Sequence, residues 1–314
     1  GTVDKRIISV ITPCFNEGVR VIECSKIINK IFAEELPEYK LEHIFCDNAS
    51  SDNTQELIKE LCRQKDTTKA IFNSRNFGIL PNTYNGVMAA TGDAVIMFMP
   101  VDLQDPPELI PEFIKHWEEG YEIVFGIRKE RKENFFLRNL RHFYYQVISF
   151  ASFTDYPADV GDYQLVDRRI IDSMKLLTDN RPFLRMLPFE IGGKKIGIPY
   201  TWKKNIRKSK NNFTQFIDQG LTGIIAFSVA PMRVCLTIGF FISLFSLGYM
   251  IYFLISYLGG NTEFASGIRT LIVSVFFFGG LNLFFLGLIG EYILSIFFNT
   301  RRSPVVYEKE RLNF

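Results

Sequence analysis

The chain has 314 residues, of which 47% are hydrophobic and 15% aromatic, and its formal net charge is +2. This length and composition allow one sizeable α/β domain and a second, more apolar part, and no nucleic-acid partner is expected. The cysteines form an odd set without close pairs, which supports neither a disulfide framework nor a zinc site and indicates a reducing, cytosolic setting. They are Cys14, Cys24, Cys46, Cys62 and Cys235. The first residues lack the apolar core of a signal peptide, so export of the first part is not expected.

Strand-like runs and helical patterns alternate through the first hundred residues. Residues 7–12 form a β-branched run that predicts a strand, and residues 19–32 carry apolar side chains at helical spacing. The same pattern recurs with strands at 41–46, 70–72 and 94–99 and with a helix at 55–62. Successive βα units predict right-handed crossovers and a mostly parallel sheet. The loops after the strands then gather at one edge of that sheet.

The run at 94–99 ends in a cluster of carboxylate and amide side chains. Asp102, Gln104 and Asp105 follow it directly, and Pro107 with Glu108 suits the first turn of a helix. Ligands bind at the carboxyl ends of strands in open α/β sheets, and oxygen ligands on a short loop suit a hard divalent cation. An equally simple interpretation makes Asp105 a helix cap.

The other loops at this edge suit a nucleotide. Neither a Gly-x-Gly-x-x-Gly fingerprint nor a Gly-Lys-Ser/Thr phosphate loop occurs in the sequence, which weakens dehydrogenase and P-loop interpretations. The remaining hypothesis is a base and ribose held by four residues, with a diphosphate near a cation at Asp102. The four residues are Pro13, Glu17, Asp47 and Arg75. Asp47 could equally be a turn or cap residue.

The middle of the chain is rich in basic and aromatic side chains. A fifth strand is predicted at 123–126, and the charge run at 128–132 follows it. Such a run is usually a solvated face, but its position beside the predicted site makes Arg128 a candidate for gripping phosphate. Residues 135–147 have one apolar helical face with arginines beside it, so this helix either packs inside a domain or lies on an anionic bilayer surface. We favour the bilayer surface because two predicted spans follow.

Two uncharged stretches predict membrane-spanning helices. Residues 234–260 and 270–290 each contain no charged side chain, and each exceeds the roughly 20 residues that cross a bilayer core. The predicted helices are about 234–258 and 270–298. Basic residues before the first and after the second predict that both ends and the first domain lie in the cytoplasm, because cytoplasmic flanks are enriched in Lys and Arg. Three domains are expected. Residues 1–134 bind the nucleotide, and residues 135–232 form a juxtamembrane part on the side of the second substrate, the acceptor. Residues 233–314 form the membrane hairpin with a short tail.

Six motifs in order resemble one family of enzymes. They are Thr-Pro-Cys-Phe-Asn-Glu at 12–17, Cys-Asp-Asn-Ala-Ser-Ser-Asp at 46–52, Asn-Ser-Arg-Asn-Phe-Gly at 73–78, Asp-Leu-Gln-Asp-Pro-Pro-Glu at 102–108, Gly-Asp-Tyr-Gln-Leu-Val-Asp-Arg at 161–168 and Ser-Lys at 209–210. The pattern resembles the polyisoprenyl-phosphate glycosyltransferases of glycosyltransferase family 2, with a GT-A Rossmann-like fold. Dolichol-phosphate mannose synthases and bactoprenol glucosyltransferases belong to this family.

The resemblance implies a function and a site. It implies inverting transfer of one sugar, UDP-glucose being the expected donor, to undecaprenyl phosphate for cell-surface glycan modification. The alternatives are a GDP-mannose-dependent mannose synthase and a non-catalytic nucleotide-sugar-binding membrane protein. Asn16 joins the nucleotide-binding residues, Asp102 and Gln104 hold Mg²⁺ or Mn²⁺, and a homo-oligomer, a tetramer, is expected. One departure is Pro100, which stands where the family usually has the first Asp of Asp-x-Asp, so one carboxylate ligand is lost.

The charges predict how the reaction proceeds. A polyisoprenyl phosphate is already an oxyanion near neutral pH, since the second pKa of such monoesters is about 6. Bringing it to a diphosphate therefore needs cations rather than a strong base. Asp162 is expected near the sugar, orienting the attack or acting as a base, although it could be only a structural loop residue. The acceptor phosphate is expected to meet a basic cluster just before the first span, Lys204, Arg207, Lys208 and Lys210. A processive synthase is not favoured, because no Gln-x-x-Arg-Trp motif occurs.

Overall fold

The computed structural model describes residues 5–128, 160–177, 183–201, 267–300 and 304–314, with isolated positions between 239 and 259. The chain divides into two compact units. The first combines Gly1–His142, Thr154–Lys210 and Arg301–Phe314, and the second combines Phe143–Phe153 and Asn211–Thr300. The boundaries expected after residues 134 and 232 stay a prediction.

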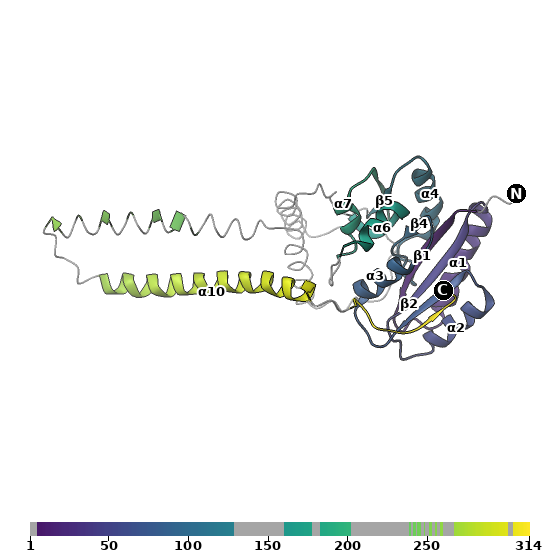
Figure 1. Ribbon diagram of the computed structural model, residues 1–314, viewed down its shortest axis with the longest axis horizontal. Coiled ribbons are helices and arrows are strands. Elements are labelled where there is room, and N and C mark those ends of the chain that lie inside the picture. Colours follow the sequence, from purple (N-terminus) through teal and green to yellow (C-terminus); the bar gives the residue numbers. More distant parts are fainter. Residues whose placement is uncertain are drawn as a thin grey trace. The chain divides into compact units, whose positions relative to one another are not determined.

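One mixed sheet forms the centre of the first unit. Figure 1 labels β5, β4, β1 and β2 of this sheet. The described strands of the sheet lie in the order β7-β5-β6-β4-β1-β2-β3-β8. They are β1 Ile7–Cys14, β2 Lys40–Asp47, β3 Thr68–Asn73, β4 Ala94–Ile96, β5 Ile123–Arg128, β6 Val160–Asp167, β7 Lys195–Tyr200 and β8 Glu308–Leu312. β1 pairs in parallel with β2 and β4, β2 pairs in parallel with β3, and β5 pairs in parallel with β7. β6 is antiparallel to β4 and β5, and β8 is antiparallel to β3. The expected α/β fold with a mostly parallel sheet is confirmed.

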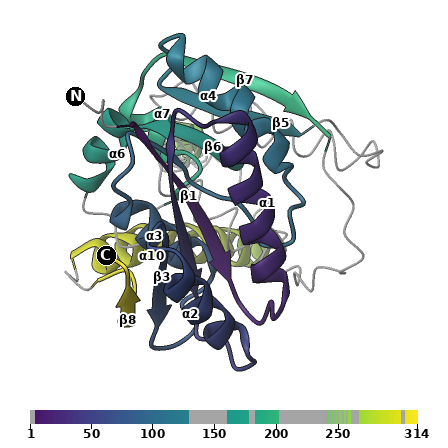
Figure 2. The same ribbon diagram turned by 90° about the vertical axis from the view of Figure 1, so that its right-hand side faces the viewer.

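Helices cover both faces of this sheet. They are α1 Arg20–Glu35, α2 Thr54–Gln64, α3 Ile79–Ala89, the 3₁₀ turn η1 Pro107–Leu109, α4 Ile110–Glu118, α6 Arg168–Lys175 and α7 Leu187–Ile191. Figure 2 shows α1 and α3 on opposite sides of β1. Val21 of α1 and Phe113 of α4 belong to the main apolar core with Val10 of β1. On the other face α3 approaches closely, since a Cβ on Gly86 would stand 2.3 Å from Cys46 Sγ. Apolar side chains on both faces explain the continuous hydrophobic runs of the central strands.

The predicted elements of the first half are found, with shifted ends. β1, β2 and β3 extend beyond the predicted 7–12, 41–46 and 70–72, whereas the fourth strand is shorter than the predicted 94–99. Beyond Ile96 the chain makes separate bonds, from Met97 N to Gln164 O at 2.9 Å and from Met99 N to Ile11 O at 2.8 Å. Pro100, which has no N–H to donate, then ends the pairing.

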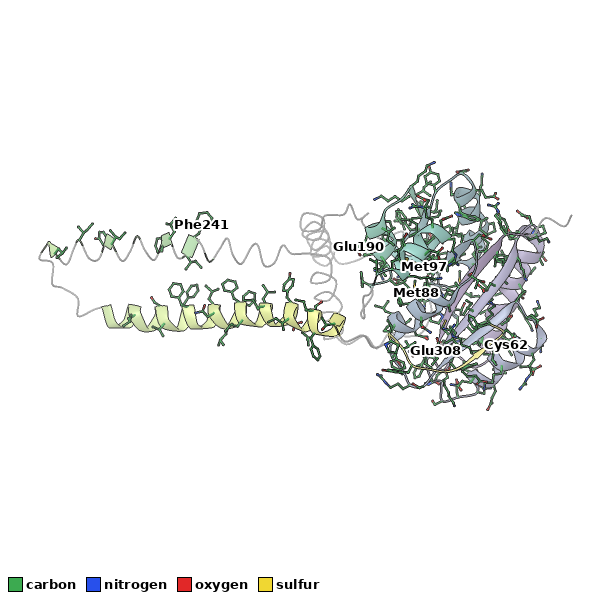
Figure 3. All side chains as sticks on the ribbon, in the orientation of Figure 1. Cys62, Met88, Met97, Glu190, Phe241 and Glu308 are labelled. Atoms are coloured by element: carbon green, nitrogen blue, oxygen red, sulfur yellow. The ribbon has the colours of Figure 1, made fainter. Side chains whose placement is uncertain are left out.

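The expected C-terminal tail contains an eighth strand. β8 pairs antiparallel with the edge strand β3. Glu308, labelled in Figure 3, accepts a hydrogen bond from Asn85 Nδ2 at 2.6 Å. Asn313 Nδ2 donates to Cys62 O at 2.8 Å and to Thr68 O at 2.7 Å. The last residues therefore cover an edge that would otherwise expose unpaired backbone groups.

The second unit contains one long apolar helix among its described residues. α10 spans Gly267–Thr300, and its segment Phe277–Phe297 is long and apolar enough to cross a membrane, with a mean hydropathy of 1.7. Its apolar side chains project from the helix (Figure 3), and Phe277, Leu283 and Ile293 are exposed. This helix includes the predicted second span at 270–298. The predicted first span at about 234–258 lies largely outside the described residues, as does the predicted amphipathic helix at 135–147.

Candidate active site

Loops at the carboxyl edge of the sheet carry several of the predicted site residues. β2 and β4 lie on opposite sides of β1, so the order of the strands reverses at β1. Open α/β sheets bind ligands at the carboxyl ends of the strands beside such a reversal. Asn16, Ala49 and Leu103 have positive φ angles of 53°, 61° and 52°, and they follow β1, β2 and β4 respectively. Residues other than glycine adopt this conformation at a cost, and such residues cluster at functional sites. This edge is the candidate active site.

The loops after β1 and β2 are joined by hydrogen bonds. Asn16 N donates to Ser50 Oγ at 2.9 Å, and Ser51 N donates to Asn16 Oδ1 at 2.8 Å. Glu17 N donates to Thr54 Oγ1 at 3.0 Å, while the Glu17 carboxylate lies 3.3 Å from Arg20 Nη1. Because Asn16 and Glu17 are held through backbone and side chain, both loops keep one relative position. Their contacts with a nucleotide stay a prediction.

Asp47 closes the turn after β2. Its side chain is fully buried, and Oδ2 accepts from Ser50 N at 3.0 Å and from Gln55 Nε2 at 2.7 Å. Ser50 Oγ donates to Oδ1 at 2.5 Å. These bonds are typical of a turn residue, which was one of the two interpretations of Asp47; the other was nucleotide binding. Pro13, also expected to bind nucleotide, is buried in β1 opposite Cys46 of β2.

A set of asparagine side chains joins the loops after β2 and β3, and the sequence analysis did not identify it. Asn48 Nδ2 donates to Asn76 Oδ1 at 2.8 Å, and Asn48 Oδ1 accepts from Phe77 N at 3.0 Å. Asn73 Nδ2 donates to Asn82 Oδ1 at 2.8 Å, and Asn82 Nδ2 donates to Cys46 O at 2.7 Å. The available signal was an asparagine at or just after the end of each of two neighbouring strands.

Arg75 is exposed on the loop after β3. Its guanidinium lies 3.9 Å from the centroid of the Phe77 ring, and Nη1 donates to Asn76 O at 3.2 Å. The Phe77 ring lies 6.2 Å from that of Tyr307, which precedes β8. A guanidinium at this distance over an aromatic face is attracted by the ring quadrupole, so Phe77 restricts where Arg75 lies.

The loop after β4 presents Asp102 in a half-buried position. Gln104 Nε2 donates to Asp102 Oδ2 at 2.7 Å, and Gln104 N lies 3.3 Å from Asp102 Oδ1. Because Nε2 is directed to Asp102, Oε1 is the Gln104 atom that could bind a cation. Within the described ranges no group of three or more His, Cys, Asp and Glu residues is arranged to hold a metal ion. Asp102 therefore offers one carboxylate, and Pro100 offers none.

Asp105 does not cap the helix that follows it. The N-cap of η1 is Pro106, without a side-chain cap bond. Asp105 is instead 1% exposed, accepts a hydrogen bond from the Tyr200 hydroxyl, and has Oδ1 3.6 Å from Arg128 Nη2. Burial raises the pKa of Asp105, and Arg128 partly offsets this effect. Arg128, at the end of β5, is thus brought to the loop that carries Asp102.

Asp162 is held by an arginine that carried no sequence motif. Arg185 Nε donates to Asp162 Oδ1 at 2.9 Å, and Nη2 donates to Oδ2 at 2.7 Å. This paired geometry is among the stronger hydrogen-bond arrangements. Burial opposes ionisation of Asp162, but Arg185 outweighs it and, with Arg128, holds the pKa of Asp162 below its usual range. Gln164 Nε2 donates to Arg185 O at 2.9 Å, which fixes the backbone of the arginine as well.

The structure brings three predicted residues into one charged group. Asp102 and Asp162 both act electrostatically on Asp105, and Arg128 acts on Asp105 and on Asp162. The group contains both signs of charge at the edge where β4 and β5 end and β6 begins. The predicted acceptor residues lie outside the described part of the chain; they are Lys204, Arg207, Lys208 and Lys210.

Two family descriptions match the sequence. Residues 9–174 match the description "Glycosyl transferase family 2". Residues 230–296 match the description "GtrB C-terminal hairpin". The first match covers β1 to β6 with their helices, and the second includes most of α10.

Similar proteins align along nearly the whole chain. A "Bactoprenol glucosyl transferase" of Shigella phage SfX is 32% identical over 97% of this chain and 99% of its own. The "Uncharacterized glycosyltransferase YkcC" of Bacillus subtilis is also 32% identical, over 95% of this chain and 91% of its own. Among solved structures, "Mannosyltransferase PcManGT from Pyrobaculum calidifontis in complex with GDP-Man and Mn2+" has 13% identity and a TM-score of 0.47, covering 96% of this chain and 89% of that one.

Proposed function

The chain belongs to glycosyl transferase family 2 and is a glycosyltransferase with a GT-A-like α/β fold, and from this premise we propose that it transfers a single sugar to a polyisoprenyl phosphate. The proposed donor is UDP-glucose, the proposed acceptor is undecaprenyl phosphate, and the transfer inverts the sugar carbon. The observation that carries the proposal is the order of the two family matches: a family 2 domain is followed by the GtrB C-terminal hairpin. Similarity over 97% of the chain to a bactoprenol glucosyl transferase supports the same acceptor class.

The donor set at Asp102 fits a divalent cation that also binds the diphosphate. Mg²⁺ is commonly held by one or two carboxylates together with substrate phosphates and water. Asp102 supplies one carboxylate, Gln104 Oε1 is a second oxygen, and Asp105 is committed to Tyr200 and Arg128. Mg²⁺ or Mn²⁺ bound there would neutralise charge on the leaving diphosphate. We propose Asp102 and Gln104 as the protein ligands.

The reaction requires two anions to approach each other. Arg128 carries a permanent positive charge and is about one-third exposed, so it is placed to contact phosphate from the side of β5. Asp162 is kept ionised by Arg185, so it is a poor proton donor at neutral pH. We propose that Asp162 orients the attack on the sugar, or accepts a proton where the acceptor phosphate is singly protonated. The nucleoside is proposed to contact Pro13, Asn16, Glu17, Asp47 and Arg75.

Membrane attachment accounts for access to a lipid acceptor. α10 is the described helix apolar enough to span a bilayer. We propose two spans, at about 234–258 and 270–298, with both termini and the catalytic domain in the cytoplasm. A reporter after Phe314 should then report cytoplasmic, and a tag at Asn261 should be labelled from outside intact cells. Failure to label the Asn261 tag would contradict the hairpin. Assembly into a tetramer remains part of the proposal.

Incubation of the purified protein with undecaprenyl phosphate and a panel of radiolabelled UDP- and GDP-sugars tests the function directly. We expect labelled lipid from UDP-glucose. Labelled lipid from GDP-mannose alone would instead identify a mannose synthase. Binding of nucleotide sugar without any transfer would indicate a non-catalytic protein and overturn the proposal.

The acceptor site is proposed at the basic cluster of Lys204, Arg207, Lys208 and Lys210. Neutralising Arg207 and Lys210 together should raise the KM for polyprenyl phosphate at least about tenfold more than that for the nucleotide sugar, since charge-assisted hydrogen bonds contribute roughly 1.5–3 kcal/mol each. Added salt should weaken the wild type towards the variant. If these residues only anchor the domain to anionic lipid, the loss disappears in detergent with a short-chain acceptor. An unchanged acceptor KM in both settings would remove the cluster from the site.

A further inference from the structure

Asp105 connects three parts of the carboxyl edge. It lies in the loop between β4 and η1, three residues after Asp102, and is 1% exposed. Its carboxylate accepts the Tyr200 hydroxyl and lies 3.6 Å from Arg128 Nη2. Tyr200 in turn accepts a hydrogen bond from Arg128 Nε at 3.2 Å. One carboxylate, one phenol and one guanidinium therefore contact one another. The Tyr200 hydroxyl donates to Asp105 and accepts from Arg128.

The strands and the packing around them restrict the position of Tyr200. Arg128 and Tyr200 are register partners at the ends of the parallel strands β5 and β7. The Tyr200 ring lies against Gly126, where a Cβ would stand 2.5 Å from Tyr200 Cε1, and it meets the Tyr163 ring edge-on at 5.9 Å. The Tyr163 hydroxyl donates to Pro106 O at 3.0 Å, which holds the same loop at a second point. Gly126 and Tyr163 thus hold the Tyr200 ring, and the held hydroxyl can orient Arg128.

Arg128 needs the contacts with Asp105 and Tyr200 because a second carboxylate, Asp162, is also near. It interacts electrostatically with Asp162 as well as with Asp105, and its side chain is 36% exposed. A long arginine side chain has many rotamers, and turning towards Asp162 would withdraw its charge from an approaching phosphate. Positioned charges accelerate a reaction only if they already lie where charge develops.

We propose that Asp105 and Tyr200 are positioning residues that aim Arg128 at the acceptor phosphate and link it to the loop that carries Asp102. The inference rests on the proposed function, in which Arg128 contacts phosphate. Asp105 and Tyr200 touch neither substrate. They act through Arg128, and the chain continues four residues beyond Tyr200 into the basic cluster proposed to hold the acceptor phosphate, at 204–210.

The chain contains a chemically matched control at the opposite edge. Arg6 Nη2 donates to the Tyr39 hydroxyl at 3.0 Å, the same hydroxyl donates to Glu118, and Arg6 pairs with Glu118 at 2.5 Å. This is another arginine, tyrosine and carboxylate group, located before β1 and β2 and at the end of α4. Tyr39→Phe and Tyr200→Phe therefore remove the same hydroxyl from the same kind of group.

The test uses the full chain in vesicles with undecaprenyl phosphate and the donor that it accepts. Tyr200→Phe should lower kcat/KM for the acceptor roughly tenfold or more, since small misplacements of reacting groups cost up to about a hundredfold. The KM for the nucleotide sugar should change less than about twofold, and Tyr39→Phe should leave both constants unchanged. In an Arg128→Ala background, Tyr200→Phe should have no further effect, because a residue that acts through Arg128 cannot act without it.

The outcomes separate this inference from the function beneath it. If Tyr200→Phe lowers activity equally with and without Arg128, or behaves as Tyr39→Phe does, Tyr200 does not position Arg128. If Arg128→Ala keeps the wild-type acceptor KM and kcat, the proposed role of Arg128 is wrong and the inference falls with it. If the wild type transfers no sugar to any polyprenyl phosphate, the proposed function itself is wrong. Tyr200→Phe keeps the ring, so the test remains valid where Asp105→Asn does not fold.

Discussion

The loops after β1, β2 and β3 are joined mainly through neutral side chains, whereas the loop after β4, the end of β5 and the start of β6 are joined through charges. In the first region Asn16 bonds to Ser51 and Asn48 bonds to Asn76. In the second region Asp105 lies beside Arg128, and Asp162 is paired with an arginine. Both regions occupy the same edge of one sheet, so the difference is in chemistry rather than in fold.

The difference suits two different tasks. Neutral hydrogen bonds hold loop shape without creating a strong field, which is adequate for recognising a base and ribose. In the proposed reaction the charged region receives a diphosphate and a second phosphate, and three carboxylates alone would repel both. Arg128 and Arg185 compensate two of the three, Asp105 and Asp162. Asp102 has no arginine partner among the described ion pairs, and this is the residue proposed for the cation.

The largest effect should come from Asp102→Asn, which removes the one carboxylate available to the cation. We expect kcat to fall about 10²–10³-fold, the usual scale for losing one electrostatic contact in the transition state. Transfer of labelled sugar to polyprenyl phosphate measures it. Asp93→Asn is the control, because Asp93 accepts from Ile7 N at 2.7 Å at the opposite edge. Near-normal turnover of Asp102→Asn in excess EDTA would disprove the metal assignment.

A smaller but still large effect is expected from Arg185→Leu, which leaves the carboxylate of Asp162 without its paired arginine. Removing one partner of such a mostly buried pair should lower the free energy of unfolding by about 3 kcal/mol at pH 7. Transfer should also fall, because Asp162 would protonate more readily and lose its orientation. Thermal unfolding in detergent and the transfer assay measure the two effects.

The same variant makes a prediction about pH. Arg185 outweighs burial and lowers the pKa of Asp162, so the pair stabilises the fold above the unfolded pKa of about 3.9 and this stability is lost as pH falls through the lower folded pKa. The difference between wild type and Arg185→Leu should therefore be largest near neutral pH and shrink below about pH 4. Arg169→Leu is the control, since its pair with Glu122 is more exposed and should contribute only about 0–1 kcal/mol. A pH-independent difference would contradict the assignment.

In the neutral region, Asn48→Ala should separate the loops after β2 and β3. Losing its buried hydrogen bonds should cost roughly 1–3 kcal/mol of unfolding free energy. The KM for the nucleotide sugar should rise while the acceptor KM stays unchanged, as titrations of each substrate would show. Asn29→Ala serves for comparison, because Asn29 bonds within α1 and to Lys65 instead. A rise in acceptor KM alone would reverse the division of tasks between the two regions.

The smallest effect is expected from Phe77→Leu, which removes the ring beneath Arg75. A cation–π contact at an exposed site contributes about 0.5–1 kcal/mol, so the donor KM should rise roughly two- to fivefold. Phe314→Leu removes a ring under Lys69 and Arg311, both at 5.0 Å, and should leave the donor KM unchanged. Equal results from the two variants would mean that Arg75 does not act on the nucleotide.

The sequence alone predicted the elements whose signal is local. Strand runs such as 7–12 and 41–46 and the helix at 19–32 correspond to β1, β2 and α1, because burial on both faces leaves continuous apolar runs and a half-buried helix leaves a periodic pattern. Asp102 could be singled out because it follows a predicted strand, and Asp162 because it lies in a motif of the family resemblance. The tail at 308–312, Glu-Lys-Glu-Arg-Leu, has no comparable signal, and its charges resemble those of a solvated segment.

Thus the sequence by itself determined the α/β class, the family resemblance and the edge of the sheet that carries the candidate site, since neighbouring residues carry these signals. Only the tertiary structure decided that β8 pairs with β3, that Arg185 holds Asp162 and that Asp105 joins Tyr200 and Arg128. Tyr200 is 95 residues from Asp105 in the chain. Such pairings depend on how strands align and which side chains meet at their ends, and no pattern of neighbouring residues records that alignment.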